Sequence, residues 1–328
     1  MSSMTEPDCD TMIEIFRKMA LIKICDERIR GAIKGGRMIA PHYSPRGQEA
    51  ISAAMAVNLR PDDYVVTIYR GLHDHLAKGV PAKKLWAEYA GRATGSCKGK
   101  GGPMHITNPE SGVVVTTGVV GSGMPIANGL AWASVLKGDG RVTVTNFGDG
   151  AANIGAFHEA LNLASAWKLP VIFLCHNNRY GEHTKFELAT SVAHIADRGA
   201  AYTMESVTVD GNDPIAVWRA SRAAVERARS GGGPTLLEAE TFRFCGHNFG
   251  DPGEYIPKQE FEDALARDPY PRYRAWLIST GVASEELLGA IESEVTREVT
   301  EAEQFALTSP YPELSELLHD VYAHEIRP

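Results

Sequence analysis

The clearest pattern of apolar and polar positions in the chain predicts a strand, a helix and a second strand. The run at 142–147 alternates β-branched residues with others and ends on Gly148-Asp149-Gly150. A second apolar run at 170–175 leads to Asn177 and Asn178. Between them, four apolar residues recur at helical spacing: Ile154, Phe157, Leu161 and Ala164. Such a unit is almost always a right-handed crossover between parallel strands.

Polar residues follow both predicted strands, Asp149 after the first and Asn178 after the second. Because parallel strands of one unit end at the same edge, we expect these residues to lie together, where open α/β sheets bind ligands. Their oxygens suit Mg²⁺ or Ca²⁺ rather than zinc, and Mg²⁺ usually bridges protein oxygens to phosphates. A helix beginning near Ala152 would point its amide groups at the same spot. The segment therefore predicts a metal-bridged diphosphate site, although Gly-Asp-Gly taken alone also fits an ordinary turn.

The rest of the chain continues the alternation of strands and helices. Apolar periodicity predicts helices at 10–34, 47–59, 81–90, 125–137 and 213–229, and strands at 64–68, 207–211 and 235–242. This order is typical of an α/β fold with a mostly parallel sheet and helices on both faces. We expect one α/β domain over 1–256, with a helical N-terminal segment at 10–60. A helical C-terminal extension at 257–328 should pack on the sheet or on a partner subunit.

Composition narrows the class of protein. The chain has 328 residues, 44% of them hydrophobic, and a net charge of -8 without a basic block, which argues against a nucleic-acid partner. No apolar run approaches the length of a membrane span. The five cysteines form no CxxC pair and are typical of reduced cytosolic thiols. The acidic segment 1–10 lacks the arginines of a transit peptide. We expect a cytoplasmic protein.

Further candidate site residues lie near other strand ends. Tyr69 and Arg70 follow the strand at 64–68, and such an arginine either grips a phosphate or remains solvated. His247 follows the last strand in a Gly-rich loop, where it either transfers protons and stabilises negative charge or braces the loop. The glycines at 118–123 permit close approach to a flat ring.

Two glycine-rich stretches fit less well with a phosphate site. The Gly/Lys-rich loop at 91–102 lacks the strand and helix context of a P-loop, so we interpret it as a shaped wall of an active site. The turn Gly138-Asp139-Gly140 precedes a strand instead of following one, and we predict no metal role for it.

The segment Gly-Asp-Gly-Ala-Ala-Asn, a helix, and then Asn-Asn-Arg-Tyr-Gly resembles the thiamine diphosphate motif of 2-oxo acid dehydrogenase complexes. It is most similar to the alpha subunit of their first, decarboxylating component, which has the thiamine-diphosphate-binding fold. The resemblance covers nearly the whole chain. It includes His42 with Gly47-Gln48-Glu49-Ala50, Tyr69-Arg70, the stretch 98–105 that ends at His105, the glycine segment 118–121, and 246–252.

This resemblance implies thiamine diphosphate and Mg²⁺ as cofactors. Asp149, Asn178 and the carbonyl of Tyr180 would hold the metal, and His247 would face the reactive thiazolium carbon. His42 and His105 would join His247 as catalytic residues. The implied cofactor-binding residues are Tyr69, Arg70, Gly118, Val120, Gly148, Asp149, Gly150, Ala151, Asn178, Tyr180 and His247.

The resemblance also implies partners. Thiamine chemistry needs a carboxylate against the aminopyrimidine ring, and in this family that glutamate lies on a separate beta subunit. We therefore expect an assembly of two alpha and two beta chains, which is inactive without beta. It would cleave a 2-oxo acid or an acetoin-like substrate and transfer the acyl group to the lipoyl domain of an acyltransferase. Alternatives are the alpha chain of a carboligase pair and a non-catalytic scaffold subunit; a Rossmann NAD binder would need a GxGxxG.

Several positions depart from the family pattern. Asn248 and Gly250 stand where regulated mitochondrial members carry phosphorylated serines, so we expect no kinase control there. Many relatives have a histidine directly after Tyr-Arg-Gly or Tyr-Arg-Ala, whereas this chain has Leu72 there, followed by His73 and His75. His176 stands at a position that is often glutamate. The stretches at 246–251 and 180–183 favour the acetoin-dehydrogenase-like branch slightly.

Overall fold

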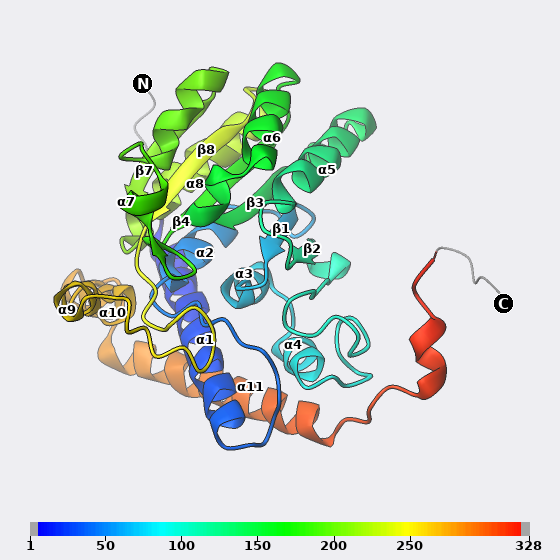
Figure 1. The fold of residues 1–328 in the computed structure, drawn as a ribbon. Helices are drawn as coiled ribbons and strands as arrows, with labels where there is room; N and C mark the ends of the chain where they lie inside the picture. Colours follow the sequence, from blue (N-terminus) through cyan, green and yellow to red (C-terminus); the bar gives the residue numbers. More distant parts are fainter. Residues whose placement is uncertain (1–5, 323–328) are drawn as a thin grey trace.

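A single parallel sheet organises the protein. The computed structural model describes residues 6–322 and shows a six-stranded sheet flanked by helices (Figure 1). The start of the acidic N-terminal segment, 1–5, and the end of the predicted tail, 323–328, lie outside the described residues. Within 6–322, no helix combines the length and apolarity that crossing a bilayer requires.

The strands run in the order β2-β1-β3-β4-β8-β7, and each neighbouring pair is parallel. Edge strand β2 is absent from the sequence predictions, and the others match predicted runs. A small antiparallel hairpin lies apart from the sheet, in the segment that begins at 180. The bounds are β1 Tyr64–Ile68, β2 Val113–Thr117, β3 Thr143–Gly148, β4 Val171–Asn177, β5 Tyr180–Gly181, β6 Thr184–Lys185, β7 Glu205–Asp210 and β8 Thr235–Glu240.

The predicted helices are present, but the helix predicted at 47–59 is shorter and α3 is additional. The bounds are α1 Cys9–Lys34, α2 Glu49–Ala56, α3 Leu72–Lys78, α4 Ala82–Tyr89, α5 Gly123–Lys137, α6 Gly155–Ala166, α7 Phe186–Ala189, α8 Pro214–Arg229, α9 Lys258–Leu265, α10 Pro269–Ser279 and α11 Glu285–Thr308. Asp213 caps α8 by accepting from the amides of Ile215 and Ala216, as its position before a proline favours.

Both faces of the sheet are covered, as the sequence predicts. Successive residues of a strand point to opposite faces, and β4 shows this directly. Ile172 and Leu174 join the core shared with α1, α2 and α8, whereas Phe173 and Cys175 join the core shared with α5 and α6. Each face therefore has its own hydrophobic core, which explains why β4 is apolar almost throughout.

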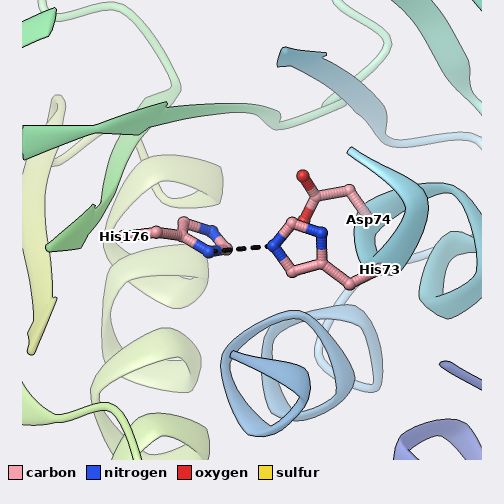
Figure 2. A group of neighbouring side chains, drawn as sticks. All are labelled: His73, Asp74 and His176. Carbon is pink, nitrogen blue, oxygen red and sulfur yellow. Dashed lines mark hydrogen bonds between the residues drawn. The ribbon is translucent and has the colours of Figure 1, made fainter. Parts of the chain in front are cut away.

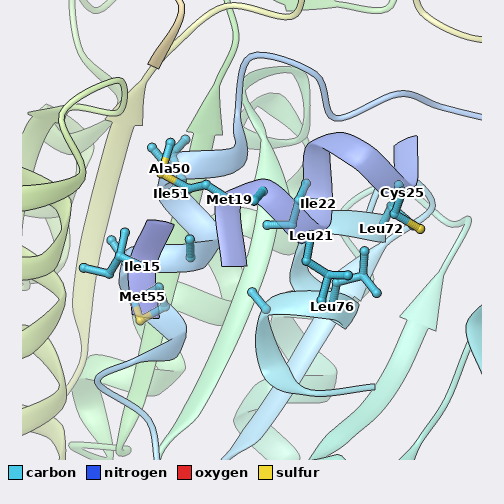
Figure 3. Close-up of a cluster of buried hydrophobic side chains, with 14 of the residues drawn as sticks. Ile15, Met19, Leu21, Ile22, Cys25, Ala50, Ile51, Met55, Leu72 and Leu76 are labelled. Carbon is cyan, nitrogen blue, oxygen red and sulfur yellow. The ribbon is translucent and has the colours of Figure 1, made fainter. Parts of the chain in front are cut away.

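Helix α1 fixes the elements that lead into the site. Its apolar face, which includes Ile15, Met19 and Ile22, packs against α2 and α3 (Figure 3). Buried Ile51 of α2 and Leu72 of α3 lie in the same cluster. Because α2 and α3 are anchored in this way, the residues at their first turns are held firmly beside the sheet.

The C-terminal extension packs chiefly on helices instead of the sheet. Helix α11 lies along α1 and α4 and buries Ala302 and Ala306 there. Buried Glu303 accepts hydrogen bonds from Arg28 at 2.5 Å and Arg37 at 3.0 Å. The expected contact with the sheet is thus largely replaced by a helix-on-helix layer within residues 6–322.

Candidate functional site at the carboxyl edge of the sheet

The predicted strand–helix–strand unit brings Asp149 and Asn178 to one cavity. Strands β3 and β4 pair in register up to Gly148 opposite His176, so their ends lie side by side. Asp149 and Asn178 both line a cavity of about 570 Å³ at this edge. The sequence could place these two residues together because the register of adjacent parallel strands follows from the lengths of the two runs.

The backbone after β3 differs from the prediction. A 3₁₀ turn occupies 149–153, extended Ile154 follows it, and α6 begins only at Gly155. The predicted helix start near Ala152 is therefore wrong. Within this turn the backbone amides of Asp149 and Gly150 lie close to the Asp149 carboxylate.

Asp149 is a buried carboxylate that forms no ion pair among the described residues, and its exposed fraction is 3%. Burial raises the pKa of Asp149 to about 6, against the lowering effect of the two backbone amides and of Arg243. A buried carboxylate is costly unless a cation or a hydrogen-bond donor compensates it. The site is therefore suited to a cation.

Asn178 and Tyr180 supply further oxygens beside Asp149. The side-chain nitrogen of Asn178 donates to Gln48 Oε1 at 3.2 Å. The Asn178 Oδ1 accepts from the backbone amide of Tyr180 at 3.3 Å. Gln48 itself is fully buried, lines the cavity, and has an Nε2 without a hydrogen-bond partner among the described residues. The sequence analysis does not single out Gln48 as a site residue, although it precedes a helix within the Gly-Gln-Glu-Ala motif.

Two buried arginines bring positive charge to the cavity. Arg70 donates to the carbonyl of Ser44 at 2.8 Å and to that of His247 at 2.9 Å. Burial and Arg243 lower the pKa of Arg70 to about 10, so it stays charged at neutral pH. Arg243 is 1% exposed and donates to Tyr255 at 2.6 Å and to the carbonyl of Tyr180 at 3.5 Å. Paired guanidinium groups of this kind attract an anion such as a phosphate.

His247 lies in the same cavity, next to Tyr69 and Tyr43 at ring distances of 6.0 and 5.3 Å. Burial first, and then the charges of Arg70 and Arg243, lower its pKa to about 4. The imidazole is therefore neutral at physiological pH. A neutral ring at this position can accept a proton or donate its N–H, but it adds no positive charge.

The structure places the other predicted residues as follows. The cavity is lined by Tyr69, Gly118, Val120, Gly148, Gly150, Ala151 and Tyr180. His42 is buried away from it, bonded to Asp26 at 2.8 Å, and lines a separate cavity beside Cys245. His105 is exposed, with its ring next to Gly118. The structure thus brings neither His42 nor His105 into the cavity of Asp149.

The Gly/Lys-rich loop has a different organisation from a phosphate cradle. The carboxylate of Glu88 accepts four backbone amides, from Cys97, Gly99, Gly101 and Gly102, at 2.8 to 3.0 Å. Lys98 and Lys100 pair instead with Asp320, at 2.8 and 2.7 Å. Within 91–105 only Met104 reaches the cavity.

A histidine cluster that sequence reasoning missed completes the cavity wall. His73 and Asp74 from the start of α3 lie beside His176 from the end of β4 (Figure 2). His176 also contacts Asn146 of β3, with Nε2 and Oδ1 separated by 3.1 Å. All four residues line the cavity. The departures from the family pattern at His73 and His176 were the available signal, but nothing in the sequence shows that these two residues touch.

Within residues 6–322, the parallel α/β sheet brings a carboxylate without an ion pair, an amide and two guanidinium groups to one edge cavity, an arrangement suited to a cation and an anion together. The chain belongs to the dehydrogenase E1 component family, whose profile matches residues 16–315. This confirms the resemblance found in the sequence and the expected relation to alpha subunits of such dehydrogenases.

Named relatives fall into two groups. The alpha subunit of acetoin:2,6-dichlorophenolindophenol oxidoreductase from Bacillus subtilis (strain 168) is 41% identical over 310 residues, which cover 94% of this chain and 92% of that protein. Its counterpart from Cupriavidus necator is 38% identical over 317 residues, with 96% and 95% covered. The pyruvate dehydrogenase E1 component subunit alpha of Rhizobium meliloti is 38% identical over 311 residues, with 94% and 89% covered.

Proposed function

We propose that this chain is the alpha subunit of a thiamine-diphosphate-dependent dehydrogenase. It cleaves a 2-oxo acid or an acetoin-like substrate and transfers the acyl group to a lipoylated acyltransferase. The observation that carries this proposal is buried Asp149, which has no ion pair within residues 6–322 and lies beside Asn178 in a cavity that also holds Arg70 and Arg243. The names of the relatives support an oxidoreductase with a donor of this class.

The residues around the cavity fit Mg²⁺ and a diphosphate. Asp149, the Asn178 amide oxygen and the Tyr180 carbonyl would hold Mg²⁺, which prefers oxygen ligands and usually bridges to phosphates. Arg70 and Tyr69 would bind the diphosphate, and the unpartnered Nε2 of Gln48 offers a further donor. Gly118 and Val120, at the rim, would hold the aminopyrimidine ring. When bound, the cofactor itself supplies the sink for the carbanion formed by bond cleavage.

His247 would move the protons of the reaction. Its ring is neutral in the free chain because burial and two arginines lower its pKa to about 4. A bound diphosphate would offset the positive charge of Arg70 and raise that pKa toward the physiological range. His247 would then act as a general acid or base at the cavity. His42 and His105 remain candidates only for indirect roles, because neither lines the cavity.

We also propose that a beta subunit completes the site, in an assembly of two alpha and two beta chains. The rim residues Val119 and Val120 are 67% and 49% exposed, and apolar side chains at a cavity mouth are suited to cover by a partner. The partner would supply the carboxylate that activates the cofactor. Free thiols at all five cysteines support the expected cytoplasmic location.

The decisive experiment is reconstitution with a beta chain of the same family. We expect turnover of acetoin or of a 2-oxo acid such as pyruvate only when both chains, Mg²⁺ and thiamine diphosphate are present. Acyl transfer should require a lipoyl domain, whereas a carboligase would turn over without one. Turnover by the alpha chain alone would contradict the shared site, and absence of cofactor binding would leave only a scaffold role.

A further inference from the structure

We propose that His73, Asp74 and His176 form a second metal site, for a transition ion of the Zn²⁺ class, in the wall of the same cavity. His73 and Asp74 come from the first turn of α3, and His176 comes from the carboxyl end of β4 (Figure 2). This site uses none of the residues proposed for Mg²⁺ and the diphosphate. The inference therefore stands independently of the proposed function.

The geometry of the cluster matches two imidazoles on one ion. His73 Nε2 and His176 Nδ1 face each other at 3.2 Å (Figure 2). Two nitrogens bound tetrahedrally to Zn²⁺ lie about 3.3 Å apart, given Zn–N distances of roughly 2.0 to 2.1 Å. A carboxylate oxygen of Asp74 and one ring nitrogen of each histidine all lie within 4.8 Å of one another. An inward movement of roughly 1 Å would place all three ligands at bonding distance.

Outer hydrogen bonds orient the ligands as they do in metal sites. His176 Nε2 lies 3.1 Å from the oxygen of Asn146, an acceptor, so Nε2 carries the hydrogen and Nδ1 keeps its lone pair toward His73. The Asp74 carboxylate accepts the hydroxyls of Ser52 and Thr67, each at 2.5 Å. Ligating histidines and carboxylates characteristically have such partners.

The protonation states also suit a metal. Burial lowers the pKa of His73 to about 4, so this ring is a neutral ligand at pH 7. Burial opposes the ionisation of Asp74, but the two histidines and the two hydroxyls hold its pKa below the ordinary value. The cluster therefore carries one buried negative charge.

Asp74 lacks the arginine or amide partners that compensate most other buried carboxylates. Glu88 and Glu238 accept hydrogen bonds from amide groups of backbone or side chain. Asp74 has two hydroxyl partners and, within residues 6–322, no arginine or lysine ion pair. Arginine ion pairs stabilise a further set of buried carboxylates: Asp26, Glu49, Asp63, Asp268 and Glu303. A cation beside Asp74 would supply the missing charge.

The donor set selects the type of ion. Two imidazoles and one carboxylate favour Zn²⁺ and related ions over Mg²⁺, which prefers oxygen. The cavity would leave the remaining coordination position open to water or a bound molecule. A second group, His194 with Glu238 and Glu240, is a weaker candidate because Glu238 accepts from Asn177 and Ala196, and Glu240 pairs with Arg179.

The test uses the full-length chain after removal of metals with a chelator. Co²⁺ serves as the probe because its visible absorption reports nitrogen and oxygen ligands in a low-symmetry site, and Zn²⁺ is then added to displace it. We expect one equivalent of Co²⁺ to bind and Zn²⁺ to displace it. His73→Gln and His176→Gln should each weaken binding by roughly 100-fold or more.

Three variants serve as controls. His75→Gln removes a buried histidine of the same helix, bonded to Thr116 at 2.8 Å and outside the cluster, and should leave Co²⁺ binding unchanged. His194→Gln tests the second group and should also have no effect. Asp149→Asn should abolish binding of Mg²⁺ with thiamine diphosphate but retain the Co²⁺ band, so failure of this site and failure of the proposed function are distinguishable.

Three results would overturn the proposal: no visible band with the wild-type chain, a band that persists in both His73→Gln and His176→Gln, or a band lost only in His194→Gln. Thermal unfolding of every variant establishes that it is folded. If one substitution prevents folding, the other histidine variant and Asp74→Asn give the answer.

Discussion

The Arg70 side chain contacts both the backbone carbonyl and the imidazole ring of His247. Its Nη2 donates to the His247 carbonyl at 2.9 Å and lies 3.5 Å from the ring Nδ1. The residues are 177 positions apart in sequence, and the contact connects the end of β1 to the loop after β8. This single side chain therefore fixes the position of the imidazole and also lowers its affinity for a proton.

The first prediction concerns the pKa of His247. We expect NMR titration of the ring to give a value near 4 in the free chain, because burial and two arginines disfavour the imidazolium. The unfolded chain binds this proton near pH 6.5, so the histidine contributes stability above that pH, and the contribution is lost as the pH falls toward 4. Arg70→Gln should raise the pKa, whereas Arg179→Gln should not. A wild-type value near 6.5 would contradict the prediction.

The second prediction separates cation binding from stability at Asp149. Asp149→Asn should abolish the rise in melting temperature that Mg²⁺ and thiamine diphosphate cause. Without ligands it should be as stable as the wild type or more stable by up to roughly 3 kcal/mol, since burial penalises the charged carboxylate. Asp139→Asn is the matched control, because Asp139 lies in a second Gly-Asp-Gly turn and should change neither quantity. Retained ligand stabilisation in Asp149→Asn would refute the metal role.

The third prediction assigns a positioning role to Gln48. Replacement by methionine removes the acceptor for Asn178 and the free Nε2 while keeping the size of the side chain. We expect the affinity for Mg²⁺ with thiamine diphosphate to fall by roughly tenfold, since a hydrogen bond contributes about 1 kcal/mol. Calorimetric titration measures this affinity. Gln259→Met, on the exposed surface of α9, is the control, and equal affinities of the two variants would rule the role out.

The fourth prediction concerns Glu88 and the Gly/Lys-rich loop. Glu88→Gln removes the charged acceptor shared by four backbone amides. We expect a loss of about 3 kcal/mol of unfolding free energy, because each hydrogen bond to a charged group contributes roughly 1.5 to 3 kcal/mol and such terms are not additive. Trypsin should then cut faster at Lys98 and Lys100. Urea unfolding and limited proteolysis test this, with exposed Glu110→Gln as the control; unchanged cleavage would contradict it.

Local sequence patterns predicted the part of the site that rests on neighbouring strands. β3 and β4 are contiguous in the chain apart from one helix, so Asp149 and Asn178 had to end together once the strand–helix–strand unit was recognised. Arg70 and His247 followed from the same rule, because each comes after a strand of the parallel sheet.

Contacts between distant segments lay beyond the sequence. His42 sits in a loop and is bonded to Asp26, a buried polar residue of α1, and no periodic pattern reports that bond. The contact between His73 and His176 depends on α3, a short helix whose packing against α1 orients its first turn. Edge strand β2 was also missed, although all five of its residues, Val113–Thr117, are β-branched and favour a strand.

The packing of α11 has a consequence for how the protein is made. Helix α1 is synthesised well before α11, which covers part of its apolar face. Arg28 of α1 donates a hydrogen bond to Glu303 of α11, which lies 275 positions later in the sequence. The face of α1 that α11 covers therefore stays exposed until α11 has been synthesised, and exposed apolar surface of this kind is prone to aggregate during synthesis.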